Sequence, residues 1–266
     1  FSDSQRAVRL HSGEILVQTA YGDTRPFVAS TIIGATSMEQ LKTNIDAFDP
    51  PEVRRREQRG WYFYDWANSV YPLIISSAIF PILYETQTSL KNEAGRTVYD
   101  TVSFLGREFH NTEFYAYVIC LSYILVALMT PLLSGIADAG GKRKLFMQFF
   151  CYMGAFSSGL LYFFHAPAAD SPFMINWSIL PLFFGSIGFW ASLVYYNAYL
   201  PDIAEAKDHD RVSARGFSMG YLGSSTLLII ILILTVFTKV LPIRWAFPLV
   251  SLWWIAFATF SFSRLP

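Results

Sequence analysis

The sequence predicts an all-α membrane protein, a bundle of six transmembrane helices preceded by a short soluble strand–turn–helix fragment. The composition is the first reason, because a chain that is 53% hydrophobic, 17% aromatic and only 15% charged is too apolar for an ordinary soluble domain. The second reason is the length of the uncharged runs at 114–137 and 145–169, each longer than the ~20 residues that cross a bilayer. The third is the short basic loop at 134–144, since such loops mark the cytoplasmic side.

Residues 1–50 form the predicted soluble fragment, because they are rich in charge and hold no run long enough to cross a membrane. The β-branched, apolar stretch at 27–33 predicts a buried strand that ends at Gly34. A helix capped by Thr36 or Ser37 is expected to follow and to extend to residue 48. A strand, a tight turn and an amphipathic helix thus precede the membrane part.

This fragment carries a first family resemblance. Residues 25–49, RPFVASTIIGATSMEQLKTNIDAFD, resemble the last strand, turn and helix of the aldo/keto reductases, which are NADPH-dependent (β/α)8-barrel enzymes. In that family the turn and the helix start hold the adenosine phosphate end of the cofactor. The resemblance implies four inherited cofactor-binding positions, Gly34, Thr36, Gln40 and Asn44. Because a barrel needs roughly 250 residues, we expect a vestigial, non-functional fragment joined to the rest near residues 49–52.

Residues 51–59 are expected to form a basic juxtamembrane linker between the fragment and the bundle of residues 60–266. Pro50 and Pro51 break the preceding helix, and four arginines follow before the first span. Juxtamembrane arginines of this kind place the N-terminal side in the cytoplasm. Because the formal net charge is zero, the chain has no basic field of the kind that nucleic-acid binding uses, and no nucleic-acid partner is expected.

Six spans are predicted, and the basic connections between them alternate with connections that carry little net positive charge. The spans are 60–84, 112–137, 145–165, 175–200, 216–238 and 245–263. The connection at 201–215 holds one Lys and two Arg and belongs inside, whereas the connection at 166–174 has neither and belongs outside. Both termini are therefore expected in the cytoplasm, in a multi-pass protein of a bacterial inner membrane.

Asp65 lies within the first span, in the sequence WYFYDWANSVYP. Asn68 and Ser69 follow three and four residues later and share its helical face. A carboxylate at the bilayer centre costs about 3 kcal/mol on insertion scales, so an acidic residue there indicates a functional site. We expect this polar stripe to contact a solute or to take up a proton or another ion. The alternative is that Asp65 lies at the membrane interface within an aromatic belt, where it merely caps or pairs.

Asn197 lies near the inner end of the fourth span and is expected to be buried there. An unpaired amide in lipid is unfavourable, so its side chain either bonds to a neighbouring helix or contacts a solute. In the fifth span, Gly216, Gly220 and Gly223 provide a small face, which indicates close helix packing.

No enzyme motif is found in the sequence, which has no P-loop, GxSxG or HExxH pattern. His165 and His209 lack neighbours at metal-ligand spacing, and the two cysteines form no CxxC pair. We therefore expect neither catalysis, nor a metal site, nor a cofactor.

The basic loop, SGIADAGGKRK, resembles the cytoplasmic signature of the major facilitator superfamily of secondary transporters, G-x-x-x-D-x-x-G-R-[RK]-[RK]. Four positions match that pattern, Asp138, Gly141, Arg143 and Lys144. Ser134 replaces the first glycine of the pattern, and Lys142 replaces an arginine. The resemblance implies that the loop controls the inner gate of a transporter. Asp202 and Arg211 flank the next inner loop and are expected to join this gate by pairing with the first loop.

Three segments further resemble the vacuole-effluxer branch of that superfamily, which includes fungal autophagy-related amino-acid exporters and bacterial relatives. They are YDWANSVYPLIISSAIFP, the basic loop, and YYNAYLPDIAEAKDHDRVSARGFSMGYLGSS. The resemblance extends from about residue 60 to the end and implies two bundles of six helices, of which this chain is the N-terminal one and the missing C-terminal half its partner. It also implies efflux of a small solute by alternating access, with amino acids as a solute class and a proton as a driving ion.

Two alternatives remain open. The first is a membrane-anchored, NADPH-dependent aldo/keto reductase, of which residues 1–50 would be a fragment. The second is a six-helix membrane protein that does not transport and that assembles with another chain.

Overall fold

The computed structural model describes residues 6–11, 14–19, 31–35, 51–92, 95, 97–139, 142–166, 173–175 and 177–266. Within this part, six helices are long and apolar enough to cross a membrane, which confirms the prediction of an all-α bundle with six spans. They are Glu52–Thr88, Asn111–Leu132, Arg143–Phe163, Trp177–Ile203, Ala206–Phe237 and Ile243–Phe262. The bounds agree with the predicted spans within several residues, except that the first and fifth spans start earlier.

The first span is built from three consecutive pieces. They are α2 (Pro51–Asn68), the π-helical segment η1 (Tyr71–Ile79) and α3 (Phe80–Thr88). The segment 51–59, expected to be a basic juxtamembrane linker, is helical and forms the start of α2. Pro51 occupies the first helical position, where the missing N–H would have had no intrahelical partner, so it starts this helix without loss. Pro72, at the start of η1, accounts for the change of helical winding, because it cannot donate to the preceding turn.

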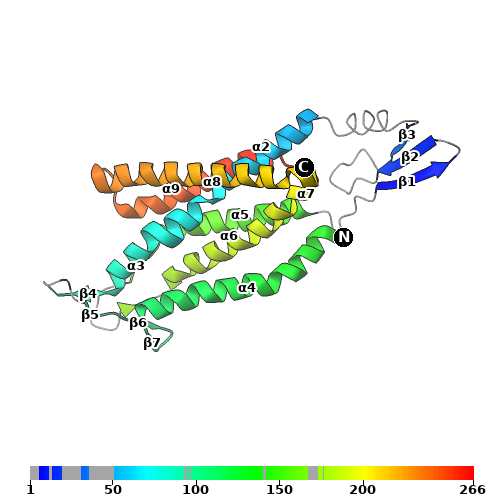
Figure 1. The fold of residues 1–266 in the computed structure, drawn as a ribbon. Helices are drawn as coiled ribbons and strands as arrows, with labels where there is room; N and C mark the ends of the chain where they lie inside the picture. The colour runs from blue at the N-terminus through cyan, green and yellow to red at the C-terminus, as the bar shows by residue number, and fades with distance from the viewer. Residues whose placement is uncertain are drawn as a thin grey trace.

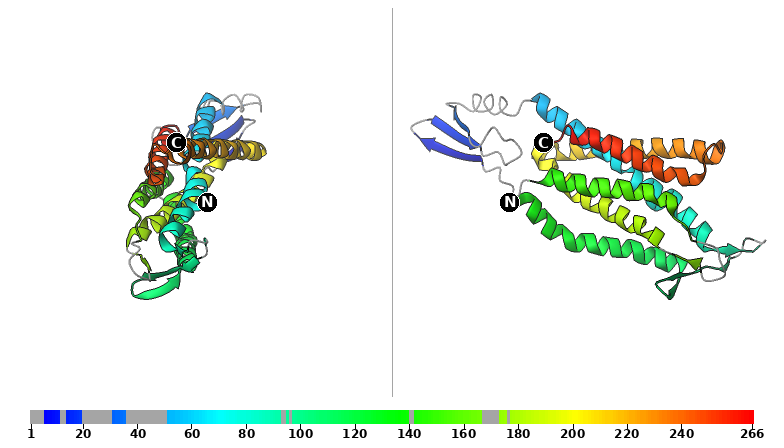
Figure 2. Two further views of the ribbon diagram at one scale, coloured as in Figure 1. Left: turned by 90° about the vertical axis from the view of Figure 1, so that its left-hand side faces the viewer. Right: turned by 180° about the vertical axis from the view of Figure 1, so that it is seen from behind.

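The remaining helices run back and forth along the first span (Figure 1). They are α4 (Asn111–Ala139), α5 (Arg143–Leu160), α6 (Leu180–Ala198), α7 (Leu200–Ile203), α8 (His209–Leu232) and α9 (Ala246–Phe262). Short segments extend or precede them, namely η2 (Leu161–Phe163), η3 (Trp177–Ile179), η4 (Ala206–Asp208), η5 (Ile233–Phe237) and η6 (Ile243–Trp245). The main contacts follow the order α8, α2, α9, α5, α6 and α4, so α8 and α4 are the outermost helices (Figure 2).

The core lies between α2, α5, α6 and α9, where the largest fully buried side chains include Tyr64 and Trp254. The backbones of α5 and α6 touch at Gly154 and Gly188, because a Cβ added to Gly188 would overlap backbone atoms of Gly154. In contrast, only 11% of the apolar stretch of the second span and 28% of that of the fifth span are buried. The two outermost helices thus leave most of their apolar surface without a protein neighbour in the described structure.

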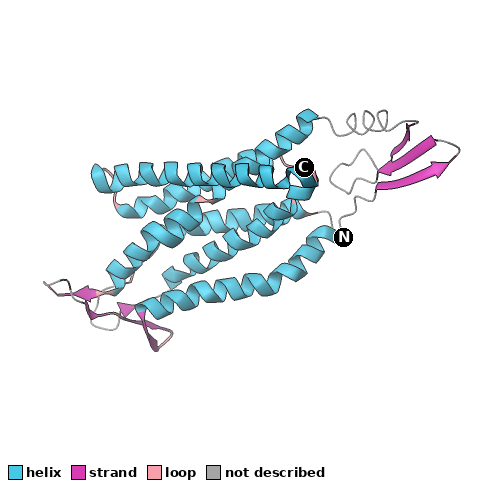
Figure 3. Ribbon diagram, in the orientation of Figure 1, coloured by secondary structure: helices cyan, strands magenta, loops and turns pink. Residues whose placement is uncertain are grey.

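The polar connection between the first two spans contains strands, whereas the sequence predicted only a loop. The strands are β4 (Leu90–Lys91), β5 (Thr97–Tyr99), β6 (Thr101–Phe104) and β7 (Arg107–His110). The two-residue strand β8 (Phe173–Met174), from the connection between α5 and α6, pairs in parallel with β6. These strands gather at one end of the bundle, which we call the strand end, and Figure 3 shows them outside the helices.

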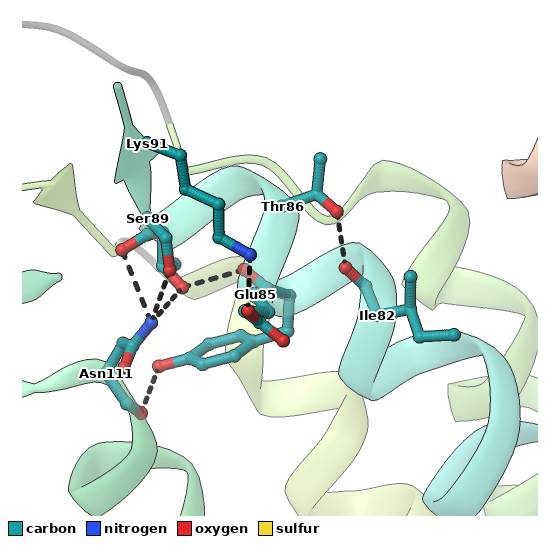
Figure 4. A network of polar contacts seen from close by, with 8 residues as sticks. Ile82, Glu85, Thr86, Ser89, Lys91 and Asn111 are labelled. Carbon is teal, nitrogen blue, oxygen red and sulfur yellow. Dashed lines mark hydrogen bonds and ion pairs between the residues drawn. The ribbon is translucent and has the colours of Figure 1, made fainter. Parts of the chain in front are cut away.

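Asn111 joins α3 to the start of α4 at the strand end (Figure 4). Its Nδ2 donates to the hydroxyls of Ser89 at 3.0 Å and Thr88 at 3.1 Å, and its Oδ1 accepts from the backbone N–H of Thr112 at 2.7 Å. The Tyr84 hydroxyl donates to the Asn111 carbonyl at 2.9 Å. Asn111 is only 3% exposed, and both its amide nitrogen and its amide oxygen make hydrogen bonds.

The fragment before residue 51 contains a three-stranded antiparallel sheet in the order β1 (Arg6–His11), β2 (Glu14–Thr19), β3 (Thr31–Ala35). The predicted strand at 27–33 corresponds to β3, but Gly34 lies inside that strand, paired with Leu16, and does not end it. The two earlier strands were not predicted. The predicted helix at 36–48 lies outside the described residues, and so do Thr36, Gln40 and Asn44.

Candidate functional site

Asp65 lies inside the bundle, on the face of α2 that packs against α8. Its side chain is 6% exposed, and its Oδ1 accepts a long hydrogen bond of 3.4 Å from the Ser69 hydroxyl. No ion pair to Asp65 is found among the described residues. A buried carboxylate without a cation is unfavourable, because little offsets the loss of hydration. The hydrogen bond between their side chains shows that Asp65 and Ser69 share one helical face, as their spacing predicts.

Asn68 lies one turn further along α2 and is 1% exposed. Neither its Oδ1 nor its Nδ2 has a hydrogen-bond partner in the part of the chain that the structure describes. Most buried side-chain amides in proteins are bonded, so an orphaned one indicates strain, a functional role or a ligand. The contrast with Asn111, the buried and bonded amide at the start of the second span, makes this observation specific.

Aromatic side chains surround Asp65, and they pack inside the bundle. Trp61 is 2% exposed and stacks on Tyr196 of α6, with ring centroids 4.3 Å apart and planes 10° apart. The Trp61 Nε1 donates to the Tyr196 carbonyl at 2.9 Å, and the Tyr64 ring also stacks on Tyr196, with centroids 5.2 Å apart. In the described structure the hydroxyls of Tyr62 and Tyr196 are buried without a hydrogen bond. An interfacial belt would leave these rings at the surface, whereas here Trp61, Tyr64 and Tyr196 are interior residues.

The glycines of α8 form the other wall of the site. A Cβ added to Gly220 would lie 3.2 Å from the carboxyl atoms of Asp65 and would overlap the Ser69 hydroxyl oxygen. A Cβ added to Gly216 would lie 3.0 Å from the Tyr196 hydroxyl. The small face of α8 thus brings its backbone against the polar groups, and these glycines border the site as well as allowing close packing.

The prediction that Asn197 is buried is wrong, because its side chain is exposed. Consecutive helical residues point about 100° apart, and Tyr195 and Tyr196 occupy the inward face of α6. Asn197 is also the last residue but one of α6, so it lies at the end of the span. The residue that α6 contributes to the site is Tyr196, which a helical phase fixed by its buried neighbours would have indicated.

The residues predicted for the gate are only partly brought together. The Arg143 Nη1, at the start of α5, lies 2.9 Å from the Asp202 Oδ2 in α7, so these two form the expected pair between the loops. Arg211 pairs with Asp208, three residues before it, at 3.0 Å, and its expected contact with the first loop stays a prediction because the side chains of residues 136–141 are not described. Asp138 belongs to α4, but its side chain is not described, and Gly141 lies outside the described residues.

Lys144 donates from Nζ to the Leu265 carbonyl at 2.7 Å, so it contacts the chain that leaves α9. Two more side chains do the same: Arg56 donates to the Ser263 carbonyl at 3.1 Å, and the Tyr199 hydroxyl donates to the Pro266 carbonyl at 3.5 Å. We call this the basic end of the bundle. Side chains from α2, from α5 and from the residue between α6 and α7 thus bind carbonyls at the end of α9, where the two cationic ones are favourable.

Glu205 adds a further contact at the basic end, because Arg54 of α2 lies 3.2 Å from its carboxylate. Lys207 lies 2.8 Å from the second carboxylate oxygen. The hydrogen bond and charge of Lys207, together with Arg54, hold the pKa of Glu205 below its usual value. Gln58 also donates to the Ile203 carbonyl at 2.9 Å, so α2 is tied to the segment after α6 by two side chains.

Six spans around a buried carboxylate and an orphaned amide define a polytopic membrane protein with a polar site inside its helical bundle, the class that includes transporters. The chain belongs to the family described as vacuole effluxer Atg22 like, whose model matches residues 53–266. Residues 1–52 lie outside this match, and nothing in it supports the reductase alternative.

Three relatives show the same relationship. The chain is 31% identical to an uncharacterized MFS-type transporter, YxiO, of Bacillus subtilis over 75% of this chain and 44% of the relative. It is 28% identical to autophagy-related protein 22 of Pyricularia oryzae over 62% of this chain and 26% of the relative. With autophagy-related protein 22-1 of Phaeosphaeria nodorum the identity is 24%, over 83% and 49% respectively. The chain therefore spans less than half the length of these relatives. No solved structure matches it significantly.

Proposed function

We propose that this chain is one half of a secondary transporter, in which a small solute binds at Asp65 and Asn68 and crosses the membrane by alternating access. The observation that carries the proposal is the Asn68 amide, which has no hydrogen bond among the described residues. It lies one turn from the Asp65 carboxylate, which has no ion pair among them, and both are buried within a bundle of a transporter family. Ser69 belongs to the same site, and Asn197 lies outside it.

The chemistry of the site favours a solute with both a positive and a negative group. Asp65 and the Asn68 Oδ1 offer acceptors to an ammonium group. The Asn68 Nδ2 and the hydroxyls of Tyr62 and Tyr196 offer donors to a carboxylate, and each lacks a hydrogen bond in the described structure. An amino acid carries this pair of groups, and we take amino acids as the solute class. Asp65 would also be the group that takes up a driving proton, because it is the only carboxylate in the set and the tyrosine hydroxyls already carry their protons near neutral pH.

The gate of this transporter would be the Arg143–Asp202 pair, with Lys144, Asp138 and Gly141 in the same loop region. In our proposal the basic end faces the cytoplasm of a bacterium, so both termini of the chain lie inside and the strand end lies on the outer side of the inner membrane. The hydrogen bonds and the ion pair that join α2, α5, α7 and α9 at this end would keep the transporter closed on its cytoplasmic side.

A second six-helix bundle would cover the exposed faces of α4 and α8. The low burial of these two spans and the greater length of the relatives both support such a half. The strand-bearing fragment before residue 51 has no role in this proposal. We regard it as vestigial, and its cofactor-binding positions as unused.

The test is solute binding to the chain in lipid nanodiscs, measured with a radiolabelled amino acid at two pH values. Competition by the free amino acid, its methyl ester and its N-acetyl derivative reports the need for each charge, and we expect only the free form to compete. Binding should weaken as the pH falls, because a protonated Asp65 no longer attracts an ammonium group. Asp65→Asn should abolish this binding, and exposed Asp210→Asn should retain it. Equal binding by the parent and Asp65→Asn would refute the assigned site.

A further inference from the structure

The β6–β7 hairpin at the strand end is held firmly at its base. The strands pair from Thr101↔His110 to Phe104↔Arg107, and β7 leads directly into α4. On its other side β6 pairs with β8, and the Ile175 N–H donates to the Ser103 carbonyl at 3.0 Å. The hairpin therefore links the start of the second span to the connection that precedes the fourth. Its position is fixed by both.

The tip of this hairpin is an apolar residue in an unfavourable backbone conformation. Leu105 and Gly106 form a two-residue turn with φ values of 52° and 76°, the geometry in which Asn-Gly is preferred. A leucine in the left-handed region is disfavoured, yet Leu105 is 74% exposed and contacts little that would retain it. Neither the turn geometry nor packing within the hairpin therefore explains why position 105 is a leucine.

The hairpin lies at the level where the spans begin. Figure 1 shows it turned to the side of the bundle at the start of α4, whereas β4 and β5 extend beyond the end. Trp177, at the start of the fourth span, is 65% exposed. Its ring packs against the Phe104 ring in a T-shaped arrangement, with the ring centroids 6.2 Å apart. Tyr117, early in α4, is 57% exposed and contacts Phe109 in β7. Exposed Trp and Tyr at the ends of spans are typical of the boundary between lipid and water.

We propose that the β6–β7 hairpin rests on the bilayer surface, with Leu105 inserted below the headgroups and Arg107 on the lipid phosphates. Only the tip is apolar, because the exposed side chains of Arg107, Glu108 and His110 follow it along β7. A protein-docking face would be a broader apolar patch, whereas a single apolar tip beside a cation suits shallow insertion into lipid. The hairpin would thus anchor two of the connections at the strand end to the membrane.

The experiment measures where the tip lies in nanodiscs that contain anionic lipid. A polarity-sensitive fluorophore is attached to Leu105→Cys in a Cys120→Ala background, because Cys120 is exposed and Cys151 is buried. Val98→Cys in β5 is the matched control, since Val98 is also apolar and 67% exposed but lies in the β4–β5 pair. We expect iodide to quench the label at 105 several-fold less than the label at 98, and doxyl-labelled lipid to quench it several-fold more.

The proposal is overturned if iodide quenches both labels equally, or if the label at 105 is shielded from iodide and from lipid alike, which would mean that protein covers it. A second reporter guards against insertion driven by the label itself. With the fluorophore on Glu108→Cys, quenching by doxyl lipid should fall when L105N is added, because Asn keeps the turn but removes the apolar tip. Unchanged quenching of that reporter would also refute the role of Leu105.

Discussion

At the scale of single residues, two buried asparagines in this chain are expected to respond in opposite ways to the same substitution. Asn68 has no hydrogen bond in the described structure, so Asn68→Leu should raise the free energy of unfolding by about 1–2 kcal/mol. Asn111 is fully bonded, so Asn111→Leu should lower it by about 1–3 kcal/mol. Thermal unfolding in one detergent measures both changes. If both variants are destabilised equally, Asn68 is bonded in the native protein and is not a free ligand group.

The more stable Asn68 variant should also lose solute binding, which separates a functional residue from a structural one. A site that keeps unsatisfied groups gives up stability that an apolar residue would recover. The binding assay described for Asp65 provides the second readout. A variant that is more stable and still binds the solute would remove Asn68 from the site.

At the scale of the helix, the glycine contacts differ in how well they would accommodate a side chain. A Cβ at Gly188 meets backbone atoms of Gly154, which cannot rotate away, whereas at Gly220 the nearest obstacle is the Ser69 hydroxyl. We expect Gly188→Ala to lower the free energy of unfolding by about 3 kcal/mol and Gly220→Ala by about 1 kcal/mol. Thermal unfolding gives the ranking, with exposed Ser218→Ala on α8 as the control. A reversed ranking would mean that α5 and α6 are not in backbone contact.

The helices could be predicted from the sequence, because the length and hydropathy of a span are local properties. The short strands could not, since β6 is completed by β8 from a connection some 70 residues away, and such pairing leaves no local pattern. The start of α2 at Pro51 could not be predicted from the sequence, because proline both ends and begins helices. Asp65 could be singled out from the sequence because a carboxylate is rare in a span, and it is buried in the bundle. Tyr196 was missed, because hydropathy does not fix the rotation of α6.

At the scale of the whole molecule, α7 and the start of α5 should become more mobile together when the contact between them at the basic end is lost. The Arg143–Asp202 pair is partly exposed and contributes under about 1 kcal/mol, so Arg143→Ala should barely change overall stability. Hydrogen exchange should nevertheless rise several-fold at α7 and at the start of α5, because the pair joins the two. Arg211→Ala is the matched control, since Arg211 pairs within its own segment. A charge swap, Arg143→Asp with Asp202→Arg, should restore protection; exchange confined to residue 143 would contradict a joint opening.

The three side chains that bind the carbonyls of residues 263, 265 and 266 give the end of α9 a fixed direction. A rigid helical tag genetically joined after Pro266 would inherit that direction instead of swinging freely. A chain of 30.2 kDa is small for electron cryomicroscopy, so such a tag on this chain would serve as an alignment marker that reports the tilt of the bundle in single-particle images.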